Sequence, residues 1–102
     1  MNASSNLGLV QLALGRIARD RSLTPVLENL LFEIADAAIY AEIAEARNVS
    51  INTIKTESRI LLAALGLRSR REIESAAEAA RLRADAGADE DDLYKFLRLR
   101  FE

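Results

Sequence analysis

The sequence predicts an all-α fold, and three observations lead to that class. Hydrophobic residues recur three or four positions apart through most of the chain, which is the spacing of one face of a helix. No segment alternates apolar and polar residues for long enough to form a convincing strand. Half of the 102 residues are hydrophobic and 29% are charged, a balance typical of chains that fold around one core. We therefore expect a single helical domain over residues 1–102.

The first two predicted helices are separated by a polar break at residues 20–22. The N-terminal helix spans residues 6–20, and its apolar face consists of Leu7, Val10, Leu14 and Ile17. Thr24 and Pro25 mark the start of the second helix, because threonine caps a helix and proline fits the first helical position. The apolar face of this second helix comprises Leu27, Leu30, Leu31, Ile34 and Ala38.

The third and fourth helices are predicted on either side of a tight turn. A short third helix ends near Arg47, and its inward-facing residues are Ile39, Ile43 and Ala44. Ser50 is the expected N-cap of a fourth helix over about 50–65, which buries Ile54, Leu61 and Leu65. Gly66 follows where a helix often ends on a left-handed residue.

The fifth and sixth helices also begin at capping residues. Ser69 and Glu72 have the spacing of a capping box, which opens an alanine-rich helix that reaches about Ala84. After a turn, Asp89 caps a C-terminal helix over residues 89–101, with acids in its first turn and bases later, as the helix dipole favours. Its apolar face consists of Leu93, Phe96, Leu97 and Phe101.

The residue types exclude most kinds of active site. The chain has no Cys and no His, and so lacks the thiolate nucleophile, the commonest general base and the commonest metal ligands. We expect no enzyme activity, no cofactor and no metal site. The apolar-rich stretch 7–18 is interrupted by Gln11 and Arg16 and is shorter than the about 20 residues that cross a bilayer. We therefore expect a cytoplasmic protein that does not enter a membrane.

Charge is distributed unevenly along the chain. Residues 47–71 contain six basic residues and one acid, whereas residues 72–92 contain eight acids and two arginines. A local basic stripe can serve DNA binding even though the whole chain has a net charge of −2. The alternative interpretation is a solvated surface on which charges are clustered by chance.

Several short segments follow a known pattern in order and without a gap. They are Leu23-Thr24-Pro25, Glu42-Ile43-Ala44-Glu45, Val49-Ser50, Asn52-Thr53-Ile54-Lys55-Thr56, Leu65-Gly66-Leu67 and Ser69-Arg70. Together they make residues 23–73 resemble the LuxR/GerE-type DNA-binding domain of bacterial regulators. The resemblance implies a helix-turn-helix unit of four helices over residues 23–84, flanked by an additional N-terminal and C-terminal helix. The helix at about 50–65 would be the recognition helix, which lies in the major groove.

The resemblance also implies which residues contact DNA. The implied contacts to base edges are Lys55, Thr56 and Arg59. The implied contacts to the DNA backbone are Tyr40, Ser50, Asn52, Thr53 and Arg68. Residues 52, 55, 56 and 59 share one side of a helix, opposite the apolar residues, and Lys and Arg are donors suited to guanine. The alternative for Lys55 and Arg59 is two solvated charges on a helix that packs against the core.

Members of this family commonly dimerise through the last helix of the unit. The corresponding residues here are Ala76, Ala77, Ala80 and Ala84. Their small side chains would let two such helices approach closely, and we expect a homodimer with this interface. The alternative is that alanine is present as the strongest helix former.

Some residues depart from the family pattern, and they leave two functions open. Ala41, Ala63 and Ala64 stand where the family usually has basic or polar residues, and Glu57 stands where it often has histidine. Ser58 occupies a position that is apolar and buried in the family, and Ile60 occupies one that is usually polar. The first interpretation is a stand-alone transcription regulator that binds double-stranded DNA as a homodimer. The alternative is a protein-interaction module with reduced DNA binding, which would act as an antagonist or co-regulator on a transcription protein.

Overall fold

The computed structural model describes the backbone of residues 3–101 and the side chains of residues 8–101, and this part of the chain contains helices joined by short turns, without a strand. The helices are α1 (Ala3–Asp20), α2 (Pro25–Ala35), α3 (Tyr40–Arg47), α4 (Ile51–Leu65), α5 (Arg70–Asp85) and α6 (Glu90–Arg100). The predicted all-α class is confirmed. The first helix begins three residues before the predicted start, and the side chain of Leu7 lies outside the described residues.

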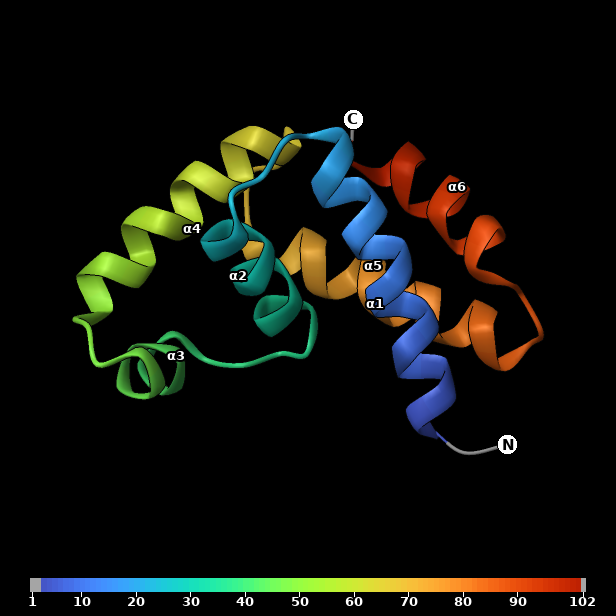
Figure 1. The fold of residues 1–102 in the computed structure, drawn as a ribbon, viewed down its shortest axis with the longest axis horizontal. Helices are drawn as coiled ribbons and strands as arrows, with labels where there is room; N and C mark the ends of the chain where they lie inside the picture. Colours follow the sequence, from blue (N-terminus) through green and yellow to red (C-terminus); the bar gives the residue numbers. More distant parts are fainter. Residues whose placement is uncertain (1–2, 102) are drawn as a thin grey trace.

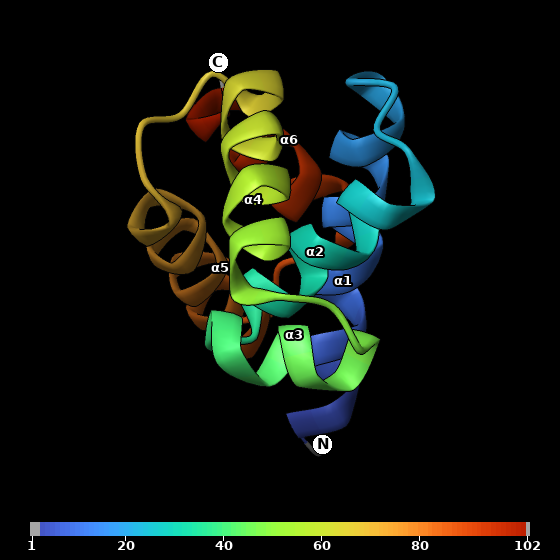
Figure 2. The ribbon, with the colours of Figure 1, turned by 90° about the vertical axis from the view of Figure 1, so that its left-hand side faces the viewer.

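Helices α2 and α5 connect two pairs of helices, α1 with α6 and α3 with α4. In Figure 1, α1 and α6 run side by side at one end of the molecule, and α3 and α4 lie at the other. Helix α5 packs against α1, α2 and α6, whereas α4 packs against α2 and α3. Figure 2 shows α4 standing at the front with α3 across its base. Helix α4 therefore keeps one long side that no other helix covers.

Small side chains on α5 bring the surrounding helices together. Ile73 and the alanines of this helix are buried, with Ala76, Ala77, Ala80 and Ala84 between 0% and 3% exposed. A methyl group lets a neighbouring helix approach closely, and close packing is what makes a protein interior stable. These alanines are occupied by contacts within one chain. The dimer interface predicted for them is therefore wrong for this fold, and any homodimer has to use another surface.

Most of the predicted helix starts are confirmed. The Oγ1 atom of Thr24 accepts a hydrogen bond from the backbone N–H of Leu27 at 3.3 Å. At the start of α6, Asp89 accepts from the N–H of Asp92 at 2.9 Å, and Asp92 in turn accepts from the N–H of Asp89 at 3.2 Å. This reciprocal pair satisfies two donors that a helix start would otherwise leave free.

Three local predictions are corrected. Ser69 precedes α5 without a side-chain cap, since the N–H of Glu72 donates to the backbone carbonyl of Ser69 at 3.2 Å, and the Glu72 carboxylate accepts from the N–H of Arg68 at 3.3 Å. Ile39 is not inward-facing: it precedes α3 and is 56% exposed. Ala38 does not belong to the face of α2, since that helix ends at Ala35 and Ala38 lies in the following turn.

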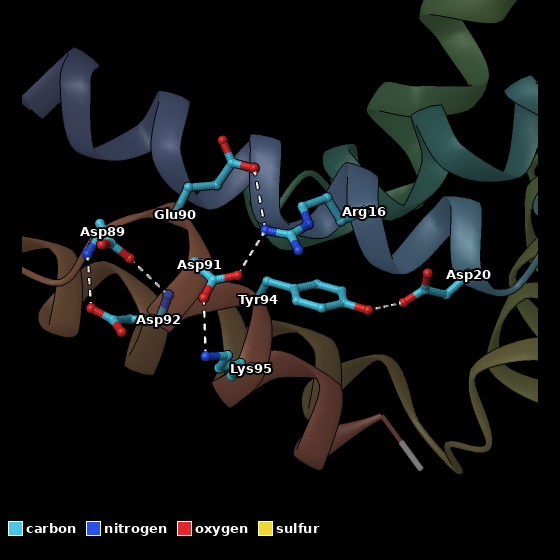
Figure 3. A network of polar contacts seen from close by, with 8 residues as sticks. All are labelled: Arg16, Asp20, Asp89, Glu90, Asp91, Asp92, Tyr94 and Lys95. Carbon is cyan, nitrogen blue, oxygen red and sulfur yellow. Dashed lines mark hydrogen bonds and ion pairs between the residues drawn. The ribbon is translucent and has the colours of Figure 1, made fainter.

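A polar network joins α1 to α6 beside their apolar contact (Figure 3). The Nη1 atom of Arg16 lies 3.3 Å from Oδ1 of Asp91 and 3.7 Å from Oε2 of Glu90. Its guanidinium stacks 3.9 Å from the ring centre of Tyr94, whose hydroxyl donates to Asp20. The network therefore fixes the register of the two helices.

Charges in this network shift the pKa of its members. The hydrogen bond and charge of Lys95, 3.1 Å away, hold the pKa of Asp91 below its usual value. In return, the hydrogen bond and charge of Asp91 raise the pKa of Lys95. The pKa of Tyr94 is raised, chiefly because its hydroxyl donates to the Asp20 carboxylate. A phenolate beside that carboxylate would lose the hydrogen bond and meet a like charge.

Arg21 joins the ends of three helices. It follows α1, and its Nη1 atom donates to the backbone carbonyl of Ala64 near the end of α4 at 3.0 Å. Its Nη2 atom donates to the carbonyl of Phe101, the residue after α6. The ring of Phe101 is buried in the core.

Within residues 3–101, no helix is long and apolar enough to cross a membrane.

The burial of Leu61 generates a prediction about stability. Leu61 is fully buried on α4, and Leu82 on α5 is 61% exposed. We expect Leu61→Ala to lower the free energy of unfolding by about 2–5 kcal/mol, because it leaves a cavity. The control Leu82→Ala should stay within about 0.5 kcal/mol of the parent. Urea denaturation followed by circular dichroism measures both, and equal effects of the two changes would contradict the assigned phase of α4.

The contact between Tyr94 and Asp20 generates a prediction about titration. Asp20→Asn removes the negative charge beside the phenol, so the pKa of Tyr94 should fall toward its ordinary value of 10.0. Carbon-13 NMR of ring-labelled tyrosine resolves Tyr94 from Tyr40 during a titration with base. An unchanged titration curve for Tyr94 would show that the hydrogen bond to Asp20 does not form in solution.

Candidate nucleic-acid interface

Helices α3 and α4 are joined by a turn whose geometry is set by three residues. Asn48 ends α3 in the left-handed conformation, with φ of 57°. The N–H of Val49 donates back to the carbonyl of Ala44 at 3.0 Å. Ser50 then caps α4, accepting from the N–H of Thr53 at 3.1 Å, as predicted. Asparagine is one of the few residues other than glycine that adopts this conformation readily, so the turn is encoded locally.

The outer face of α4 carries the predicted base-contacting residues. Lys55, Thr56 and Arg59 are exposed, as is Asn52 one turn earlier. The opposite face is buried and consists of Ile54, Ser58, Leu61 and Leu65. The predicted helical phase of α4 is therefore confirmed, and the structure brings these exposed polar residues together on one side of the helix.

The basic stripe at residues 47–71 divides into paired and unpaired cations. Arg47 and Arg70 are engaged in ion pairs within the chain. The exposed cations of the stripe that form no side-chain hydrogen bond or ion pair with another described residue are Lys55, Arg59, Arg68 and Arg71. These cations lie along α4 and at the turn into α5. The remaining positive charge of the stripe is therefore concentrated on and beside the outer face of α4.

Several acids of the segment at residues 72–92 form ion pairs or hydrogen bonds within the chain. Glu74 pairs with Arg70 at 2.5 Å, and Glu78 lies 3.6 Å from Arg81. Other acids of this segment accept backbone hydrogen bonds at helix starts or pair with Arg16 on α1. This segment therefore does not present a continuous block of unpaired negative charge to a partner.

Glu57 belongs to a three-residue ion-pair network. The Nη1 atom of Arg47 lies 2.9 Å from the Glu57 carboxylate, and its Nη2 atom lies 2.5 Å from that of Glu33 on α2. We refer to Glu33, Arg47 and Glu57 as the Arg47 triad. Sequence reasoning missed it, since it only counted Arg47 among the six basic residues and Glu57 as the one acid of residues 47–71. The three residues meet only because α2, α3 and α4 pack together.

The candidate contacts to the DNA backbone are not all equivalent. Ser50, Asn52 and Thr53 are exposed at the start of α4. Arg68 is exposed beyond the other end of that helix, which is roughly 22 Å long at 1.5 Å per residue. Arg71, to which sequence analysis assigned no role, lies near Arg68 in sequence and is also exposed. Polar groups are thus available at both ends of α4.

Tyr40 is separated from these residues by its own contacts. Its hydroxyl lies 2.5 Å from Oγ of Ser58, which is 2% exposed on the buried face of α4. The guanidinium of Arg70 stacks on its ring at 4.9 Å from the centre. Arg70 also donates to the carbonyl of Ala38 at 2.7 Å. Tyr40 therefore serves the packing of α3 against α4, and its polar atom is directed to Ser58.

The hydrogen bond between Tyr40 and Ser58 generates a prediction. Tyr40→Phe removes the partner of a buried hydroxyl, which should cost about 1–3 kcal/mol of stability. Adding Ser58→Ala in that background should cost nothing more or recover part of the loss, because no buried polar group is then left unpaired. Chemical denaturation of both single variants and the double variant measures the coupling. Strictly additive losses would contradict the hydrogen bond.

Comparison with known proteins was made for the whole chain. No protein-family model, no curated protein and no solved structure matches it.

Proposed function

We propose that this protein is a small DNA-binding transcription regulator, with α4 as the recognition helix of a LuxR/GerE-like helix-turn-helix. The observation that supports this most strongly is the outer face of α4. It presents Lys55, Thr56 and Arg59 to solvent, and neither cation is paired with a described carboxylate. Unpaired cations on a helix face that no neighbouring helix covers are suited to a polyanionic partner.

The chemistry of these residues fits the major groove. Lysine and arginine donate to O6 and N7 of guanine, and the methyl group of Thr56 can contact a thymine methyl. Ser50, Asn52, Thr53 and Arg68 would bind phosphates, which sets the register on DNA without reading the sequence. The major groove of B-DNA is about 12 Å wide and admits one helix.

A homodimer in the cytoplasm is part of the proposal. Dimeric regulators of this kind place two recognition helices in successive major grooves, about 34–36 Å apart, on an inverted repeat. The buried alanines of α5 exclude that helix face as the contact. The interface would then lie on residues that are exposed in one chain.

A second candidate function is a protein-interaction module that binds a transcription protein. The observation that favours it is the large number of exposed apolar side chains near α3 and α4, namely Ile39, Val49, Ile51 and Ile60. Ala41 and Ala63 are also exposed and supply no donor to phosphate. Exposed apolar side chains commonly mark surfaces that bind other proteins where they are contiguous.

Selection of bound duplexes from a random pool at low salt distinguishes the two functions. A regulator should enrich a palindromic motif, and its affinity should fall steeply with salt, with a slope of about −0.9 for each phosphate neutralised. An interaction module should enrich nothing. Absence of any enriched motif would therefore overturn the proposed function in favour of the second candidate.

The outer face of α4 generates a prediction about specificity. Lys55→Ala and Arg59→Ala should each weaken binding to the selected site by about 1–3 kcal/mol and weaken binding to random DNA much less. Arg68→Ala should weaken both equally and reduce the salt slope by about one. The control Lys95→Ala removes one exposed charge on α6 and should preserve the preference for the selected site. Fluorescence anisotropy measures each affinity, and unchanged binding by the Lys55 and Arg59 variants would contradict the assignment.

The proposed oligomeric state is tested separately. We expect light scattering at micromolar concentration to give twice the chain mass of 11.3 kDa. A mass near that of one chain across the whole range would rule out a stable homodimer in the absence of DNA.

A further inference from the structure

We propose that Arg47 is a positioning residue for DNA binding: it holds the Glu57 carboxylate against α3 and so keeps an uncompensated negative charge away from the recognition face. This inference rests on the proposed function. It assigns a binding role to a residue that does not itself read a base. It also explains how an acid can stand between Lys55 and Arg59 in the sequence of the recognition helix.

The geometry of the Arg47 triad supports this role. The two terminal nitrogens of Arg47 engage different carboxylates, Glu57 at 2.9 Å and Glu33 at 2.5 Å. The side chains of Arg47 and Glu57 are only 22% and 24% exposed. Arginine presents several donors in a rigid planar fork, so one guanidinium can hold two carboxylates in fixed directions. Glu33 thereby orients Arg47, and Arg47 orients Glu57.

The placement of Glu57 on α4 explains why the contact matters. Successive helical residues are rotated by about 100°, so Glu57 points to the side of α4 opposite the midpoint between Lys55 and Arg59. Glutamate has a long, flexible side chain. Without Arg47, its charged carboxylate would be free to leave the partly buried contact and extend toward solvent beside the groove. There it would repel the DNA phosphates.

Two other roles for Arg47 would give different results. If it only stabilises the packing of α2, α3 and α4, removing Glu57 as well restores DNA affinity only as far as it restores the melting temperature. If Arg47 contacts phosphate directly, the loss of DNA affinity in Arg47→Gln does not depend on Glu57.

If Arg47 matters only through the net charge, removing any nearby acid restores the affinity. Glu45 provides that comparison, because it is exposed on α3 and forms no ion pair with a described residue.

The experiment compares the parent with Arg47→Gln, Arg47→Gln/Glu57→Gln and Arg47→Gln/Glu45→Gln. The two double variants have the same formal charge as the parent. The probe is the duplex selected by the parent, and anisotropy titrations are made at two salt concentrations. Circular dichroism and thermal melts establish that each variant is folded. We expect Arg47→Gln to bind about tenfold more weakly, the Glu57 double variant to return to within about threefold, and the Glu45 double variant to stay weak.

Failure of the inference can be told from failure of the proposed function. If the parent binds DNA but the Glu57 change restores nothing, or Glu45 restores as much, the positioning role is overturned. Unchanged binding by Arg47→Gln overturns it too. If the parent binds no duplex, the proposed function fails and this inference fails with it.

A single substitution keeps the test decisive if the Arg47 variants do not fold. Glu57→Gln alone should change affinity by less than about twofold, as should the matched control Glu45→Gln, because the Glu57 carboxylate is already held away from DNA. A gain of about tenfold specific to Glu57→Gln would show that this carboxylate faces the phosphates in the parent and would overturn the inference.

Discussion

The close approach of three helices along the alanines of α5 is the constraint on which the rest of the fold depends. Larger side chains there would push α1, α2 and α6 outward, since a packed interior has little room for added volume. Because α5 is surrounded by those helices, α4 is held mainly by α2 and α3. The same packing that closes the core therefore leaves the outer side of α4 uncovered. The positions of the buried alanines on α5 therefore influence which side of α4 is available for binding.

Ion pairs then determine which charges remain for a partner. Arginines near helix junctions, such as Arg47, Arg70 and Arg81, pair with nearby carboxylates or donate to backbone carbonyls. The cations on the outer face of α4 lie on a side that faces no other helix, and they stay unpaired within the described residues. An overall net charge of −2 thus conceals a local positive surface. Composition alone could not separate the paired charges from the unpaired ones.

The helices and the phase of α4 could be predicted from the sequence because the signals are local. Thr24, Ser50 and Asp89 each cap a helix through neighbours three residues away, and the burial of Leu61 follows from periodicity. Contacts between distant segments could not be predicted. The burial of the α5 alanines depends on α1 and α6, and the Arg47 triad needs α2, α3 and α4 in place. At α5 the Ser69–Glu72 spacing does not produce a capping box, since the Glu72 carboxylate accepts from the N–H of Arg68.

The contacts of α1 with the end of the chain have a consequence for synthesis on the ribosome. Asp20 meets Tyr94, Arg16 meets Asp91 and Arg21 meets Phe101, pairs separated by 74, 75 and 80 residues. At about 5–20 residues per second, α1 would wait roughly 4–16 s before its partner helix is translated. During that interval its apolar face has no native cover from α6. During translation, α1 therefore waits longer for its partner helix than α3 does, because α3 and α4 are neighbours in the sequence.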